Sequence, residues 1–128
     1  MTTTLEHLNI TVSDPEETAA LLVDLFDWTI RWKGEALNDG TTIHVGEAGN
    51  GSGYLAIYAT PEEPLETPTQ NHVAHINHIG IVVDDLEETE RRVISAGLTP
   101  HSHGDYAPGR RFYFDDFDKI EFEVVSYS

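Results

Sequence analysis

The sequence predicts an α+β fold made of two β-α-β-β-β modules, and an internal repeat carries this prediction. Residues 7–18 read HLNITVSDPEET and residues 78–89 read HIGIVVDDLEET, so seven of the twelve positions are identical at an offset of 71. Each copy begins with alternating apolar residues and continues into a capped helix. We interpret the chain as two copies of one supersecondary unit.

Each module is predicted to open with a strand that has one packed face. In both copies an apolar residue occupies every second position: Leu8, Ile10 and Val12 in the first copy, and Ile79, Ile81 and Val83 in the second. Period two with β-branched residues is typical of a half-buried strand. His7 and His78 then lie on the polar face of their strands.

A helix is predicted to follow each of these strands. Asp14 precedes Pro15 and Glu17 follows three residues after it, which is the pattern of a capping box with proline at the first helical position. Asp85 and Glu88 repeat the pattern in the second copy. We expect the two helices to end near Asp27 and Gly97.

Three shorter strands should complete each module. We place them near residues 28–33, 41–46 and 54–59, and near residues 98–103, 111–114 and 120–126. Between the modules, residues 61–71 hold three prolines and three glutamates, which suit neither a central strand nor a helix interior. We therefore predict a first module at 1–60, a linker at 61–71 and a second module at 72–128. Residues 104–109 are expected to form a loop.

Charge narrows the range of partners. The 128 residues include 23 acidic and seven basic side chains, giving a formal charge of -16. Such a surface repels nucleic-acid phosphates and anionic lipid headgroups, so we expect no nucleic acid and no membrane among the partners. The chain has no cysteine, and its first residues lack the features of a secretory signal. A cytoplasmic protein is the expectation.

Three side chains form a candidate metal site. His7 and His78 occupy the same position in the two repeats. In the last predicted strand Phe122 and Val124 should face the core, which turns Glu121 and Glu123 to the opposite face. A carboxylate that becomes buried there needs a cation or a donor. Two imidazoles and one carboxylate suit a divalent ion with open coordination positions.

The doubled H-x-x-I-x-V-x-D-x-E-E-T unit and the segment FYFDDFDKIEFE at residues 112–123 resemble the vicinal oxygen chelate superfamily. This superfamily includes glyoxalase I, extradiol dioxygenases, fosfomycin-resistance transferases and bleomycin-resistance proteins. The resemblance implies that the paired modules form a cupped eight-stranded mixed sheet around a central cavity, with metal ligands at His7, His78 and Glu123. Phe117 and Lys119 depart from the D-P-D-G turn of the family.

The resemblance also bears on the number of ligands. Glyoxalase I enzymes usually supply a fourth ligand from the strand at residues 54–58, where this chain has Ala56 or Tyr58 facing the cavity. A three-ligand set is more similar to extradiol dioxygenases and fosfomycin-resistance enzymes. Tyr113, ten residues before Glu123, resembles their substrate-facing tyrosine and is the candidate catalytic residue. The cofactor is then a divalent metal, with Fe, Mn, Zn and Ni all open.

Two functions follow as hypotheses. The first is a metal-dependent enzyme of the glyoxalase/dioxygenase type, acting on a small oxygen-rich substrate. The second is a metal-free binding protein of the bleomycin-resistance type, in which aromatic residues line a cleft. The resemblance makes a homodimer plausible, with modules paired within one chain or exchanged between two. His101 and His103, expected on one strand face, and His44 are additional candidates for the site.

Overall fold

The computed structural model describes residues 3–36, 40–49, 53–59 and 72–128. The chain divides into two compact units, residues 1–64 and 65–128, and each is described by itself. The predicted linker at 61–71 lies outside the described residues.

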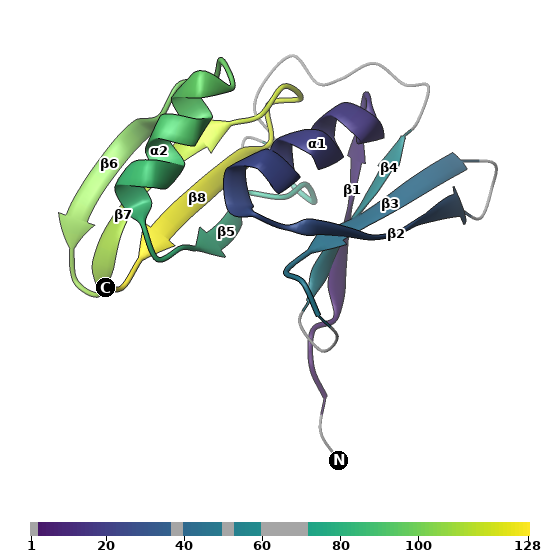
Figure 1. Cartoon of the computed structure of the whole chain (residues 1–128), viewed down its shortest axis with the longest axis horizontal. Coiled ribbons are helices and arrows are strands. Elements are labelled where there is room, and N and C mark those ends of the chain that lie inside the picture. The colour runs from purple at the N-terminus through teal and green to yellow at the C-terminus, as the bar shows by residue number, and fades with distance from the viewer. Residues whose placement is uncertain (1–2, 37–39, 50–52, 60–71) are drawn as a thin grey trace. The chain divides into compact units, whose positions relative to one another are not determined.

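The first unit is a four-stranded mixed sheet with one helix (Figure 1). Its elements are β1 (His7–Val12), α1 (Pro15–Phe26), β2 (Thr29–Ala36), β3 (Gly40–Gly46) and β4 (Tyr54–Ala59). The strand order is β1-β4-β3-β2. β1 runs parallel to β4, whereas the other two pairings are antiparallel.

The second unit repeats this arrangement. Its elements are β5 (Ile79–Val82), α2 (Leu86–Ser95), β6 (His101–Tyr106), β7 (Gly109–Asp115) and β8 (Glu121–Ser126). The order is β5-β8-β7-β6, again with one parallel pair, β5 with β8. The predicted α+β class with two β-α-β-β-β modules is therefore confirmed, its eight strands forming two four-stranded sheets.

Both helices begin at the predicted caps. Asp14 Oδ1 accepts hydrogen bonds from the backbone N–H groups of Glu16 and Glu17, and Asp85 Oδ1 accepts one from that of Glu88. At the other end Asp27 and Gly97 have φ angles of 56° and 87°, in the left-handed region that ends a helix. None of the described helices is long and apolar enough to cross a membrane.

The core of the second unit fixes which side chains face away from it. Phe112, Phe114 and Phe122 are fully buried, and the rings of Phe114 and Phe122 stack at 5.1 Å. Because successive residues of a strand point to opposite faces, burial of Phe122 and Val124 turns Glu121 and Glu123 to the other face. The predicted facing of this strand is confirmed.

The strand registers relate positions of the two units to one another. Leu8 pairs with Leu55 as Ile79 pairs with Phe122, so Ala56 in β4 is the counterpart of Glu123 in β8. One strand farther, His44 pairs with Ala56 as Tyr113 pairs with Glu123. The carboxylate position of the second unit is thus an alanine in the first.

A hydrogen-bonded turn at Asp116 connects β7 to β8 and precedes the strand that carries Glu123. Asp116 Oδ1 accepts from the backbone N–H groups of Asp118 and Ile120, both at 2.9 Å. Burial raises the pKa of Asp116 from its ordinary 3.8 to about 6. Lys119 has a φ of 65°, in the left-handed region that glycine adopts without steric cost. The turn therefore has a positive φ at a residue that is not glycine.

Several segment boundaries differ from the sequence prediction: β2 runs on to Ala36, and the β6–β7 hairpin departs most. Residues 98–100 are not part of a strand, and β6 begins at His101. Residues 104–109 are not a loop, because β6 runs to Tyr106 and β7 starts at Gly109, with only residues 107–108 in the turn. Alternation is weak in this glycine-rich segment, so the hairpin gave little sequence signal.

The left-handed conformation of Lys119 predicts an ordering of two variants. Lys119→Gly and Lys119→Ala both remove the side chain, but only glycine adopts positive φ without steric cost. We expect the glycine variant to be more stable than the alanine variant by about 1 kcal/mol in urea unfolding. Equal stability, or a more stable alanine variant, would contradict the role assigned to this backbone position.

Candidate metal centre

Glu123 lies among three polar side chains of the second unit. Its Oε2 accepts hydrogen bonds from Arg111 Nη1 at 2.8 Å and from the Tyr113 hydroxyl at 3.1 Å. Its Oε1 faces His78 Nε2 at 3.3 Å. The Glu123 side chain is only 14% exposed, so these neighbours replace most of its contact with water. The two carboxylate oxygens therefore have different partners: Arg111 and Tyr113 bind Oε2, and His78 faces Oε1.

The tautomer of His78 follows from its other ring nitrogen. His78 Nδ1 lies 2.7 Å from Asn77 Oδ1, which can only accept, so Nδ1 carries the proton. Nε2 of this ring lies 3.3 Å from Glu123 Oε1, a separation that either a proton on Nε2 or a bound cation can bridge. A cation bound to both would separate its ligands by about 3 to 3.5 Å.

Arg111 and Tyr113 hold the second oxygen of Glu123. The bond to Glu123 raises the pKa of Arg111, so the guanidinium remains charged. Burial and the same carboxylate raise the pKa of Tyr113, which keeps its hydroxyl protonated and able to donate. Arg111 also lies over the ring of Tyr106, 4.7 Å from its centroid. Sequence reasoning missed Arg111 as a partner of Glu123, although the β7–β8 register places the two on neighbouring strands.

The first unit presents a matching histidine. His7 Nδ1 lies 2.7 Å from Glu6 Oε1, so Nδ1 carries a proton and Nε2 is the ring nitrogen left for a metal ion. Glu6 and Asn77 each directly precede the repeated histidine, a signal in the repeat that sequence reasoning did not use. The hydrogen bond to His7 lowers the pKa of Glu6. Acceptors of this kind commonly orient metal-binding imidazoles.

Aromatic rings continue from His7 across the first sheet. The His7 ring stacks on Tyr54 at 4.9 Å, Tyr54 on His44 at 4.6 Å, and His44 contacts Trp32 at 5.0 Å. Burial lowers the pKa of His44, which favours its neutral form. His44 therefore lies on the same sheet face as His7, as a member of an aromatic row.

The prediction that His101 and His103 share one face is wrong. His101 stacks on Tyr113 at 6.3 Å, whereas His103 stacks on Phe112 at 5.9 Å and bonds Glu90 of α2 at 2.6 Å. Neighbouring residues of β7 point to opposite faces, so the two histidines do as well. Ser102 between them has a φ of 56°, and the pairing register shifts there. This bulge reverses the alternation that the prediction assumed.

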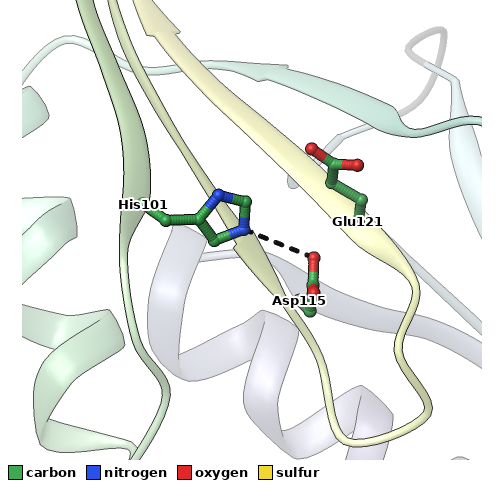
Figure 2. A group of neighbouring side chains, drawn as sticks. All are labelled: His101, Asp115 and Glu121. Carbon is green, nitrogen blue, oxygen red and sulfur yellow. Dashed lines mark hydrogen bonds and ion pairs between the residues drawn. The ribbon is translucent and has the colours of Figure 1, made fainter. Parts of the chain in front are cut away.

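A further group of potential metal ligands lies on the Glu123 face. His101, Asp115 and Glu121 offer ligand atoms that all lie within 4.8 Å of one another. Figure 2 shows the His101 ring turned toward the Asp115 carboxylate, with Glu121 on the neighbouring strand. His101 Nε2 and Asp115 Oδ1 are 3.5 Å apart. Glu121, which was predicted only to share a face with Glu123, thus has partners of its own.

The structure brings together three of the four predicted site residues. His78, Glu123 and Tyr113 are neighbours in the second unit, where the rings of His78 and Tyr113 meet edge to face at 5.7 Å. His7 belongs to the first unit, and its membership of the same ligand set stays a prediction.

The sequence matches the Glyoxalase/Bleomycin resistance protein/Dioxygenase superfamily over residues 4–124. The chain belongs to this superfamily. The resemblance noted from the repeat is thereby confirmed. No curated protein matches the chain.

The fold of this chain is similar to solved structures of this superfamily and of fosfomycin-resistance proteins. A glyoxylase/bleomycin resistance protein/dioxygenase domain from Frankia sp. EAN1pec has a TM-score of 0.81 at 17% identity, covering 98% of this chain and 93% of that one. FosX from Listeria monocytogenes, complexed with Mn(II) and sulfate, has a TM-score of 0.74 at 22% identity, covering 100% and 95%. FosX from Mesorhizobium loti has a TM-score of 0.73 at 26% identity, covering 98% and 92%.

The contacts of Glu123 predict how an arginine variant responds to metal. Arg111→Met removes the cation beside Glu123, so we expect the metal-free variant to melt several degrees below the wild type. Added Mn²⁺ should raise its melting temperature more than it raises that of the wild type, because the ion replaces the lost positive charge. Differential scanning fluorimetry with and without EDTA measures both effects.

Arg110→Met is the matched control for this experiment. Arg110 is the preceding residue of β7 and pairs with the exposed Glu87 of α2. Exposed ion pairs contribute little to stability, so this variant should melt close to the wild type and respond to Mn²⁺ as the wild type does. An equal response of both variants would show that Arg111 is not coupled to a metal site at Glu123.

Proposed function

We propose that this protein is a metal-dependent enzyme of the glyoxalase/dioxygenase type that acts on a small oxygen-rich substrate. The observation that carries the proposal is the approach of two potential ligand atoms, His78 Nε2 and Glu123 Oε1, to 3.3 Å. Their separation suits two ligands of one divalent ion, and both groups are oriented by other neighbours. The fosfomycin-resistance structure that contains Mn(II) supports a metal function within the same fold.

His7, His78 and Glu123 would hold the ion. The tautomers of both histidines fit this role, because each ring donates from Nδ1 and leaves Nε2 available. Ala56, the counterpart of Glu123 in the first unit, supplies no ligand atom, so the set has three protein ligands. Three ligands leave open positions for a substrate or water, as in catalytic rather than structural sites.

A divalent ion at this position polarises bound oxygen atoms and stabilises negative charge that develops on them. Arg111 fixes Oε2 of Glu123 and leaves Oε1 directed at His78. The Tyr113 hydroxyl holds its proton against Glu123, and we propose that it donates instead to a substrate oxygen when substrate is bound. Arg111 would continue to hold Glu123 during this exchange. Mn, Fe, Zn and Ni all accept such a ligand set.

A metal-free binding protein of the bleomycin-resistance type is the second candidate. The aromatic row of His7, Tyr54, His44 and Trp32 favours it, because stacked rings on one sheet face suit an apolar or cationic ligand. The net charge of -16 is also compatible with a cationic ligand. Metal that depends on Glu123 separates the two candidates, since the binding protein would hold no ion at this position.

Metal content is predicted to depend on the proposed ligands. Protein produced with Mn, Fe, Zn and Ni in the medium should carry at least one ion per chain by mass spectrometry of the metals. His78→Ala, Glu123→Gln and His7→Ala should each hold about one ion per chain less than the wild type, because each removes a direct ligand. Tyr113→Phe is the control that should retain the ion, because it leaves Nε2 of His78 and Oε1 of Glu123 in place. Unchanged occupancy in all three ligand variants would refute the metal site, and loss in all but His7→Ala would exclude His7.

We also propose that the protein is a homodimer, and the subunit arrangement has its own test. Size-exclusion chromatography with light scattering should give twice the mass of one chain. If modules are exchanged between chains, mixing His7→Ala with Glu123→Gln protein under mild denaturation and refolding restores metal to one site of each heterodimer. Intrachain pairing predicts no restoration. A monomeric mass would contradict the dimer.

A further inference from the structure

We propose that His101, Asp115 and Glu121 form a second divalent-cation site on the same sheet face as Glu123. The three side chains come from the adjacent strands β6, β7 and β8, and their ligand atoms lie within 4.8 Å of one another (Figure 2). None of them belongs to the set proposed for catalysis, so this inference does not rest on the proposed function.

The β7–β8 register places two negative charges directly opposite each other. Asp115 pairs with Glu121 in the antiparallel ladder, so their side chains share one face. Like charges directly opposite in a sheet repel, and the unfolded chain has no such constraint. Both side chains are partly exposed, which lessens the repulsion without removing it. A cation between them would turn the repulsion into attraction.

His101 supplies a nitrogen donor to the same point. Its Nδ1 lies 2.9 Å from the Ser102 hydroxyl, and its Nε2 is directed at Asp115 Oδ1 at 3.5 Å. That separation is long for a hydrogen bond but ordinary for two ligands of one ion. One imidazole and two carboxylates favour a first-row transition ion such as Zn²⁺ or Mn²⁺ over Mg²⁺, which prefers oxygen ligands.

The position of this cluster relates it to the first site. Asp115 and Glu121 lie two residues along their strands from Tyr113 and Glu123, which is about 7 Å at strand spacing. This distance exceeds that of bridged two-metal centres, which are about 3.5–4 Å apart. The second ion would therefore bind independently and add positive charge beside the first site. The His101 ring stacked on Tyr113 connects the two positions.

Zn²⁺ binding to chains that lack the first site tests the proposal. Glu123→Gln should still bind about one Zn²⁺ per chain in isothermal titration calorimetry, with excess Mg²⁺ present to occupy sites made of carboxylates alone. Adding His101→Gln or Glu121→Gln should weaken this binding ten-fold or more, because each removes a direct ligand. Adding His103→Gln is the matched control, because His103 lies on the same strand but on the opposite face.

Each outcome separates this site from the first one. The second site would be overturned, and the first left intact, by either of two results. One is the absence of Zn²⁺ binding to Glu123→Gln. The other is a Zn²⁺ affinity of the His101→Gln and Glu121→Gln chains equal to that of the His103→Gln control. Retained binding in Glu123→Gln that is lost with His101→Gln supports it, even if the wild type shows no ion at Glu123. Circular dichroism melts check that each variant is folded, and Glu121→Gln, nearly isosteric, gives the result if His101→Gln does not fold.

Discussion

The Glu123 carboxylate is the interaction around which the second unit is organised. Its two oxygens are divided between opposite sides, with Arg111 and Tyr113 on Oε2 and His78 on Oε1. A carboxylate this poorly exposed is costly unless its charge is matched and its lone pairs are used. Arg111 matches the charge but leaves one oxygen facing an imidazole. A proton on His78 Nε2 or a bound cation completes the contacts of Oε1.

The geometry of Glu123 depends on the core beneath it. Three fully buried phenylalanines, Phe112, Phe114 and Phe122, fix the registers of β7 and β8 against α2. A slip of one residue would turn Glu123 into this core and expose Phe122 to solvent. The Asp116 turn sets the same register from the other side, through two backbone hydrogen bonds to one carboxylate oxygen. Packing and polar contacts therefore specify the same register.

Much of the fold could be predicted from the sequence because the same strand-and-helix pattern occurs twice, at residues 7–18 and 78–89. The caps at Asp14 and Asp85, the alternation in β1 and β5, and the facing of Glu123 all follow from local rules. The directions of the His101 and His103 side chains could not be predicted in this way. A single positive φ at Ser102 reverses the alternation between them, and nothing in the local sequence indicates that a serine adopts this conformation. Arg111 and the Asp115–Glu121 pair were missed for a different reason. They depend on which residues of β7 and β8 stand opposite each other, and register is a long-range property.

The two units share one framework but divide the chemistry unequally. Ala56 of the first unit occupies the position of Glu123, and His44 occupies that of Tyr113. On the next strand, Trp32 pairs with His44, whereas His101 pairs with Tyr113 in the second unit. At these positions the second unit therefore carries Glu123 and Arg111, while the first carries a row of stacked rings that includes the imidazoles of His7 and His44. Replacing a carboxylate with alanine removes a charge that would otherwise need its own partner. It also limits the proposed ligand set to three, and three ligands are what leave an ion open to a substrate.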